Sequence, residues 1–160
     1  MKAVGYYEDG NLVDVEVPAP QAGPTDLLVE VKAVSVNPVD YKVRRSRKAE
    51  GGRPVILGWD AAGVVREVGP GVSGFRPGDE VFYAGALLRP GTYAELQAVD
   101  YRIVGRKAGT VSFAEAASLL LTSLTAWEGL FERLDFPTSG GARILLSAAR
   151  AAWARSASNS

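Results

Sequence analysis

Short apolar runs separated by turn clusters fill the first 107 residues, and this spacing constrains the fold more than any other feature. The 18 glycines and 9 prolines are scattered among these runs rather than gathered in one region. Both residue types break regular structure, because glycine adopts turn conformations freely and proline fixes its own φ. Short strands joined by such turns favour a mainly β domain with helices, built as a small closed or partly open barrel.

The apolar runs predict where the strands lie. We expect strands over residues 1–7, 11–17, 27–36, 54–69 and 80–83, with two more between 91 and 107. Gly58 and Gly63 lie inside the run 54–69 and predict bends or a close backbone approach within one long strand. Residues 44–53 are polar with a basic start, which predicts a solvated loop.

A helical pattern replaces the strand pattern after residue 107. Ser112 and Glu115 form the sequence signature of a capping box, which opens a helix. The apolar residues that follow recur at steps of three and four, which predicts a buried helical stripe: Phe113, Ala117, Leu120, Leu124, Trp127 and Phe131. The helical region ends near residue 137, and GARILLS (141–147) predicts a strand of the kind that starts a parallel sheet.

The overall charge and hydropathy exclude several classes of partner. Lys plus Arg and Asp plus Glu both count 18, so the net charge gives no support for nucleic acid or an anionic membrane as partner. No apolar run approaches the roughly 20 residues of a membrane span, and the first residues lack the apolar stretch of a secretory signal. We therefore expect a cytoplasmic protein. Cysteine and histidine are both absent from the sequence.

Two segments place polar side chains at the ends of apolar strands. VSVNPVDYK (34–42) carries Asn37, Asp40 and Tyr41, and ILGWDAAGVV (56–65) carries Trp59 and Asp60. Strand ends are where a barrel-like domain presents groups to a ligand. The alternative is that these residues cap a turn or pack locally, as a tryptophan beside a glycine often does.

The order of motifs resembles the medium-chain dehydrogenases. The resemblance is carried over residues 1–146 by MKAVGYY, DLLVEVKAVSVNPVDYKVR, ILGWDAAGVV, GVSGFRPGDEVFYAG, GTYAELQAVD and SFAEAASLLLTSLTAWE. It is strongest to the quinone oxidoreductase branch, whose members are often named zinc-type alcohol dehydrogenase-like. It implies a GroES-like catalytic domain with its C-terminal helices over 1–137. Residues 138–160 then hold only the first strand of an NADPH-binding Rossmann domain.

The resemblance also implies that zinc is not bound. In the zinc-dependent branch a cysteine stands at the position of Asn37, a histidine at that of Trp59 and an acidic residue at that of Asp60. A hydroxyl of the proton relay stands at the position of Val39. A catalytic zinc takes thiolate, imidazole and carboxylate ligands, which this set does not provide. A zinc-dependent alcohol dehydrogenase is therefore a disfavoured alternative.

The metal-free branch implies hydride transfer from NADPH to a quinone or a conjugated enone. Such acceptors need positioning and a proton donor rather than a Lewis acid. The implied catalytic residues are Asn37, Asp40, Tyr41 and Asp60, where Asn37 also orients the cofactor or a substrate carbonyl. Tyr41 stacks on the acceptor or donates a proton.

Further residues follow from the same resemblance. Thr122 and Thr125 fall in a helix segment that approaches the cofactor, although their hydroxyls alternatively bond to helix carbonyls. The implied substrate pocket consists of Tyr41, Trp59 and Tyr83. Homodimers are expected only where the Rossmann domain is present.

The last residues depart from the resemblance. A Rossmann strand runs into a glycine-rich turn that binds the pyrophosphate, whereas residues 148–160 read AARAAWARSASNS. Read one base upstream, the same codons can encode GGAGGVGSIGIQL, so we hypothesise a frameshift near Ser147. An engineered boundary with a tag and a natural short variant are the alternatives. The 160-residue chain is then expected to be an inactive fragment with weak or no NADPH binding. A non-catalytic GroES-like binding module is the competing function.

Overall fold

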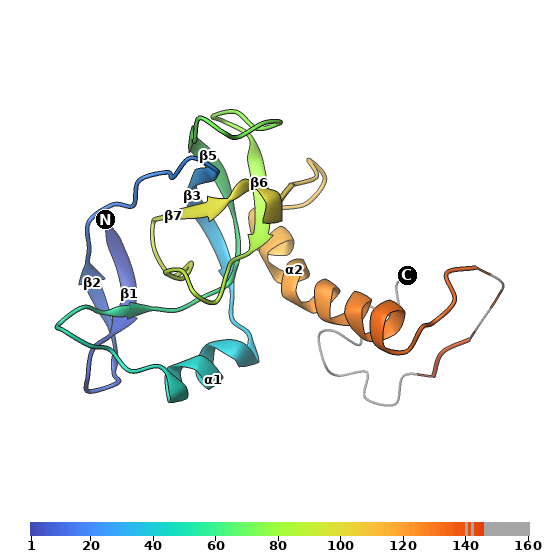
Figure 1. Ribbon diagram of the computed structural model, residues 1–160, viewed down its shortest axis with the longest axis horizontal. Helices are drawn as coiled ribbons and strands as arrows, with labels where there is room; N and C mark the ends of the chain where they lie inside the picture. The colour runs from blue at the N-terminus through green and yellow to red at the C-terminus, as the bar shows by residue number, and fades with distance from the viewer. Residues whose placement is uncertain (140, 142, 146–160) are drawn as a thin grey trace. The chain divides into compact units, whose positions relative to one another are not determined.

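The computed structural model describes residues 1–139, 141 and 143–145 (Figure 1). The chain divides into two compact units, Met1–Ser118 and Leu119–Ser160. The first unit contains all the strands found among the described residues, together with helix α1 and the beginning of helix α2. The predicted domain boundary at residue 137 stays a prediction.

A three-stranded antiparallel sheet forms one part of the first unit. It contains β1 (Lys2–Tyr6), β2 (Leu12–Glu16) and β4 (Val55–Ile56), in the order β2-β1-β4. β1 and β2 form a hairpin whose register runs from the pair of Lys2 with Glu16 to the pair of Tyr6 with Leu12. The first two predicted strands are therefore confirmed.

A five-stranded antiparallel sheet forms the rest of the β structure, in the order β7-β3-β5-β6-β8. Its strands are β3 (Asp26–Ser35), β5 (Asp60–Val68), β6 (Glu80–Ala84), β7 (Leu96–Asp100) and β8 (Val104–Arg106). A short 3-10 helix, Tyr101–Ile103, joins β7 to β8. The buried core of this sheet consists of Leu27, Val29, Ala61, Val65, Val81, Tyr83 and Val99. Within the described residues no pairing joins β7 to β8, so the sheet is open, as a partly open barrel requires.

The predicted single strand over 54–69 is wrong, because the chain turns in its middle. Val55 and Ile56 pair with β1 in the first sheet, whereas β5 begins at Asp60 in the second. Gly58 lies between them with a φ of 98°, a conformation that side chains disfavour. The predicted close approach at Gly63 is confirmed, because a Cβ there would overlap the backbone of Glu30.

Helix α1 (Pro38–Ser46) replaces the first part of the loop that was predicted over residues 44–53. Pro38 occupies the first turn, where its fixed φ suits a helix and its missing N–H costs no bond. Arg44 and Arg45 lie in the last turn, where positive charge is favourable. The start of the basic run is thus the end of a helix rather than a loop. The sequence did not distinguish the two, because a solvated helix end and a solvated loop have the same composition.

Helix α2 (Phe113–Trp127) begins with the predicted capping box and continues into a π-helical segment, Glu128–Arg133. The backbone N–H of Ser112 donates to the Glu115 carboxylate over 2.7 Å, and the Glu115 N–H donates to the Ser112 hydroxyl over 3.2 Å. At the start of the helix, Ala117 is fully buried with Ala62. The prediction that the whole stripe is core is wrong, because Leu124 and Trp127 are 45% and 58% exposed. Trp127 instead contacts Phe131 of the same helical segment.

The chain after the π-helical segment shows no strand over the part that is described. Gly141 and Arg143–Leu145 belong to the predicted strand 141–147 but adopt no strand conformation, and Leu145 is 91% exposed. Residues 146–160, with the hypothesised frameshift, lie outside the described residues. Among the described helices, none is both long and apolar enough to cross a membrane.

Candidate functional site

The site begins at the N-terminus of α1. Asn37 is the N-cap residue, and its backbone is extended, with φ −124° and ψ 161°. The Asp40 carboxylate accepts the Asn37 backbone N–H over 2.5 Å, and the Asp40 N–H donates to the Asn37 carbonyl over 3.0 Å. Both side chains are buried, so this cap holds an amide and a carboxylate in fixed positions inside the domain. The capping interpretation of Asn37 and Asp40 therefore describes their local bonding.

Strand β5 brings Asp60 to the same place. Asp60 is its first residue, paired with Ser35 of β3 on one side and Ala84 of β6 on the other, and it is completely buried. The side-chain amide of Asn37 donates to Oδ2 of Asp60 over 2.9 Å. A buried carboxylate requires such donors, because it has lost its hydration. This hydrogen bond therefore connects the start of α1 to the start of β5.

Tyr93 is the fourth member of the site, and the sequence analysis did not identify it. The backbone N–H of Tyr93 donates to the Leu57 carbonyl over 2.9 Å, and the neighbouring Thr92 N–H donates to the Gly58 carbonyl over 3.0 Å. Burial raises the pKa of the Tyr93 phenol, and the negative charge of Asp40, hydrogen bonding to its carboxylate and the charge of Asp60 raise it further. The phenol therefore stays protonated at neutral pH.

We call Asn37, Asp40, Asp60 and Tyr93 the polar cluster. Two of its buried atoms, Asp40 Oδ1 and the Tyr93 hydroxyl oxygen, form no hydrogen bond of standard geometry with the described protein groups. A buried polar atom without a partner costs stability, so each is a position at which a ligand group would be favourable. The turn GTY directly before a strand was the available signal for Tyr93, but its proximity to Asp40 requires the fold.

The predicted substrate-pocket residues lie in three different environments. Tyr41 is on α1 and is 54% exposed, so its ring is accessible. Trp59 is 4% exposed and packs with Tyr6 and Leu57 in an apolar cluster against which Tyr93 also packs. Tyr83 is fully buried in the core of the five-stranded sheet, where burial raises the pKa of its hydroxyl. Local packing thus describes Trp59 and Tyr83, and their pocket roles stay predictions.

The predicted cofactor-binding threonines belong to the second unit. The Thr122 hydroxyl donates to the Leu119 carbonyl over 2.9 Å, and the Thr125 hydroxyl donates to the Leu121 carbonyl over 2.8 Å. These are the bonds to the helix backbone that the alternative interpretation describes. The cofactor role of both threonines stays a prediction.

The residues present do not fit a catalytic zinc ion. The sequence contains no cysteine and no histidine. Over the described part of the chain, no group of three or more Asp, Glu, Cys or His side chains is arranged to hold a metal. The polar cluster offers two carboxylates, an amide and a phenol, and Asn37 already uses its amide to donate to Asp60. No chemical step is therefore assigned to zinc.

Two antiparallel sheets and a helix whose cap and first turn bury Asn37 and Asp40 define a GroES-like domain of the alcohol dehydrogenase type. The family described as the alcohol dehydrogenase GroES-like domain matches residues 23–125, and the chain belongs to this family. The predicted family and fold class are thereby confirmed. The predictions of activity, cofactor and substrate concern a whole enzyme, so we compare the chain with its relatives.

The similar proteins are oxidoreductases by name. A zinc-type alcohol dehydrogenase-like protein of Staphylococcus aureus (strain COL) is 41% identical over 145 residues, which cover 87% of this chain and 43% of that protein. A 2-methylene-furan-3-one reductase of Solanum lycopersicum is 37% identical, over 91% of this chain and 40% of that protein. The structure of Escherichia coli quinone oxidoreductase complexed with NADPH is 27% identical with a TM-score of 0.73, over 83% of this chain and 41% of that one. The chain thus spans less than half the length of the relatives it matches.

Proposed function

We propose that this chain forms the acceptor-binding part of an NADPH-dependent oxidoreductase that transfers hydride to a quinone or a conjugated enone without a metal. The names of the Solanum and Escherichia relatives supply the two acceptor classes and the cofactor. The chemistry of the polar cluster supports this choice over a zinc alcohol dehydrogenase, because an alcohol substrate requires a Lewis acid or strong base to become a hydride donor. An enone or quinone carbonyl requires only a hydrogen-bond donor.

The observation that carries the proposal is the protonated phenol of Tyr93, which interacts with the same two carboxylates, Asp40 and Asp60, that hold Asn37. The pKa of Tyr93 is raised by burial and then by Asp40 and Asp60, so at neutral pH its hydroxyl donates a hydrogen bond. Asp40 is the protein group that acts on this hydroxyl, and among the described groups no hydrogen bond of standard geometry satisfies it. A carbonyl oxygen of the acceptor is the complementary group, and a hydrogen bond to it stabilises the negative charge that develops during hydride addition.

The other residues have positioning roles in this proposal. Asp60 and Asp40 hold the Asn37 amide and backbone in one orientation through bonds of 2.9 and 2.5 Å. Tyr41, whose ring is exposed, stacks against a planar acceptor. NADPH, when bound, supplies the hydride. Asn37, Thr122 and Thr125 are the residues of this chain proposed to contact NADPH, and the rest of its site lies in the portion of the relatives that this chain does not cover.

The test is a fusion of residues 1–137 to the remaining part of the Staphylococcus aureus relative. Oxidation of NADPH in the presence of menadione or cyclohexenone, unaffected by a metal chelator, is the expected result. The variant Asn37→Leu should lower kcat/KM about 10- to 100-fold, because the cofactor and acceptor lose their orientation. Activity with primary alcohols that a chelator abolishes would contradict the proposal.

A fusion that does not fold leaves the acceptor-binding half testable in the chain itself. Amide NMR spectra of the chain, titrated with cyclohexenone, should shift at Asn37, Asp60 and Tyr93. Cyclohexene serves as the control, because it keeps the ring and the double bond but has no carbonyl oxygen to accept from Tyr93. Equal shifts with both compounds, or shifts only elsewhere, would refute the assignment of the acceptor site.

A further inference from the structure

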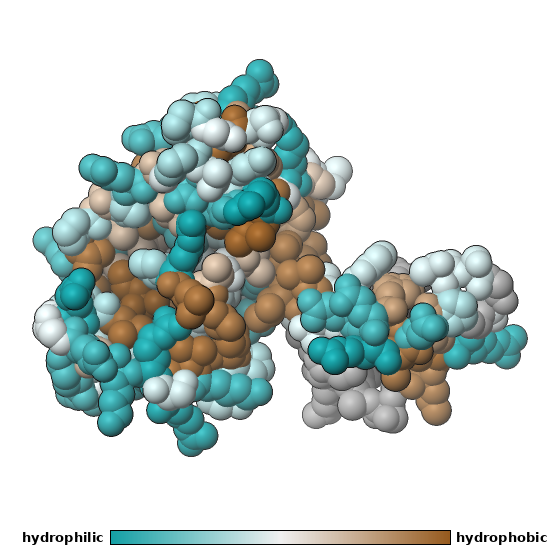
Figure 2. Space-filling view, in the orientation of Figure 1, coloured by the Kyte–Doolittle hydropathy of each residue, from teal (hydrophilic) through white to brown (hydrophobic). Residues whose placement is uncertain are grey.

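A pocket lies in the first unit and shares no lining residue with the polar cluster. Its volume is about 360 Å³. Apolar walls come from the segment after β2, from β4 and from β7: Val17, Pro18, Pro20, Ile56 and Leu96. Figure 2 shows apolar surface around β1, β4 and the segment that leads into β7. A pocket of this size holds a molecule with one or two rings.

Gln97 of β7 gives this pocket a directed polar group. Its side chain is 95% buried, since only 5% remains exposed. Its amide nitrogen donates to the Pro90 carbonyl over 2.9 Å, which fixes the orientation of the amide plane. The other end, Oε1, is buried and has no hydrogen-bond partner among the described groups. Gln97 lines the pocket, so an immobilised hydrogen-bond acceptor without a partner belongs to a residue of its wall.

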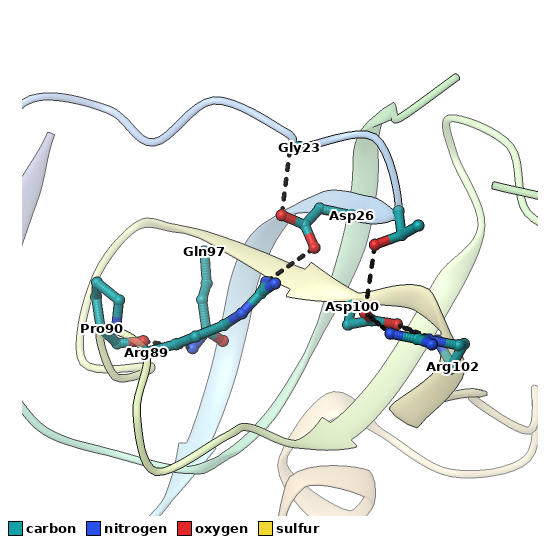
Figure 3. A network of polar contacts seen from close by, with 8 residues as sticks. Gly23, Asp26, Arg89, Pro90, Gln97, Asp100 and Arg102 are labelled. Atoms are coloured by element: carbon teal, nitrogen blue, oxygen red, sulfur yellow. Dashed lines mark hydrogen bonds and ion pairs between the residues drawn. The ribbon is translucent and has the colours of Figure 1, made fainter. Parts of the chain in front are cut away.

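Two charged groups line the pocket, the Arg89 guanidinium and the amino terminus of Met1. Arg89 lines the pocket and forms an ion pair with Asp26 over 2.8 Å, as Figure 3 shows beside Gln97 and Pro90. Asp26 also accepts the backbone N–H of Gly23 over 3.2 Å. The second charged group is the α-ammonium of Met1, which donates to the Val17 carbonyl over 2.7 Å. The guanidinium is thus paired with a carboxylate, and the remaining walls are mainly apolar, so the complementary molecule is mainly apolar.

We propose that this pocket binds a small aromatic molecule that carries a hydroxyl or N–H donor, with the donor bonded to Gln97 Oε1. The apolar walls take the ring, and the donor supplies the bond that the amide oxygen lacks. The inference is independent of the reaction proposed above. The two sites involve the two ends of the segment 56–60: Ile56 lines this pocket, and Asp60 belongs to the polar cluster.

The experiment compares two probes that differ in a single hydrogen-bond donor. Naphthol has the hydroxyl, and its methyl ether keeps the rings and the oxygen but cannot donate. Titration of the isotopically labelled chain, followed by amide NMR, should give saturable shifts at Val17, Ile56, Gly91 and the Gln97 side-chain amide. We expect naphthol to bind about tenfold or more tightly than the ether, because the ether leaves a buried acceptor unpaired.

Variants locate the effect. Gln97→Met keeps the length of the side chain and removes the amide, so naphthol and its ether should bind alike. Ala98→Leu reduces the volume of the pocket and should weaken both probes, whereas Ala108→Leu, at an exposed position outside the pocket, should change neither. The two leucine variants keep the test valid if Gln97→Met fails to fold.

Three results would overturn the proposal. The first is equal affinity of the two probes for the unchanged chain. The second is a set of shifts centred on Asn37 and Tyr93 instead of on β7. The third is the absence of saturable binding, which would mean that solvent water is a sufficient partner for Gln97 Oε1.

Discussion

Replacement of Gly58 by alanine is the sharpest test of how the two sheets and the polar cluster depend on one turn. Gly58 has a φ of 98°, and an added Cβ would lie 2.5 Å from Cδ1 of the Tyr93 ring, with Thr92 equally close. Two costs therefore add: the unfavourable φ of alanine and the displacement of a packed ring. The first is about 1–2 kcal/mol, and the second about 1–3 kcal/mol.

Gly78 provides the matched control. Its φ of 93° is nearly the same, but nothing lies within 4 Å of an added Cβ. Gly78→Ala should therefore lower the free energy of unfolding by about 1–2 kcal/mol, and Gly58→Ala by about 2–5 kcal/mol. The difference between the two variants measures the packing of Tyr93 and Thr92 against the turn, because the backbone cost is shared.

The assay is urea unfolding of both variants followed by far-UV circular dichroism. Introducing Gly58→Ala into a Tyr93→Ala background should recover part of the loss, because the ring that the new methyl group meets is gone. A coupling of about 0.5–3 kcal/mol is expected for residues in such contact. Equal destabilisation at Gly58 and Gly78, within about 0.5 kcal/mol, would refute the claim that this turn is packed against the site.

Three further predictions concern individual groups. Tyr6→Phe removes the 2.8 Å bond from its hydroxyl to the Arg47 carbonyl and should lower the free energy of unfolding by about 1 kcal/mol. Tyr83→Phe removes a buried hydroxyl without a partner among the described groups and should leave stability unchanged or higher. Thermal melts of the Tyr6→Phe and Tyr83→Phe variants test both expectations. Arg102, chiefly through its side-chain hydrogen bond, holds the pKa of Asp100 below its ordinary value of 3.8. The stability that this interaction contributes is therefore present above pH 3.8 and is lost as the pH falls further below it. Asp100→Asn should flatten that part of a stability–pH curve, and an unchanged curve would contradict the assignment. Finally, the chain should bind NADPH weakly or not at all, whereas saturable fluorescence enhancement at micromolar concentration would contradict that expectation.

Sequence patterns predicted the strands well wherever one face of a strand is buried. β3 and β7 alternate or concentrate apolar residues between turn signals, and their positions follow from that pattern. The run 54–69 was harder, because periodicity cannot show that a chain leaves one sheet and enters another. Gly58 marked the place, but glycine in a strand predicts a bulge as readily as a change of sheet.

The candidate site was only partly predictable for a similar reason. Asn37 and Asp40 are three residues apart, so the helix start that joins them is local information. Asp60 was identified from its own strand end, but the 2.9 Å bond from Asn37 depends on the pairing of β3 with β5. Tyr93 was missed because only the hydrogen bonds of the Gly58 turn bring residues 92 and 93 to this end of the domain. No local pattern contains that information.

The polar cluster contains more polar groups than folding requires, and this argues that it is arranged for a ligand. Asn37 satisfies Asp60, and one oxygen of Asp40 caps α1. The remaining Asp40 oxygen and the Tyr93 hydroxyl form no hydrogen bond of standard geometry in the described structure, although the carboxylate acts on the phenol. Phenylalanine at position 93 would keep the ring against Gly58 and remove the buried hydroxyl. Departures of this kind from best packing are expected at functional sites. A ligand that accepts from the Tyr93 hydroxyl and donates to Asp40 Oδ1 would form the hydrogen bonds that folding leaves unmade.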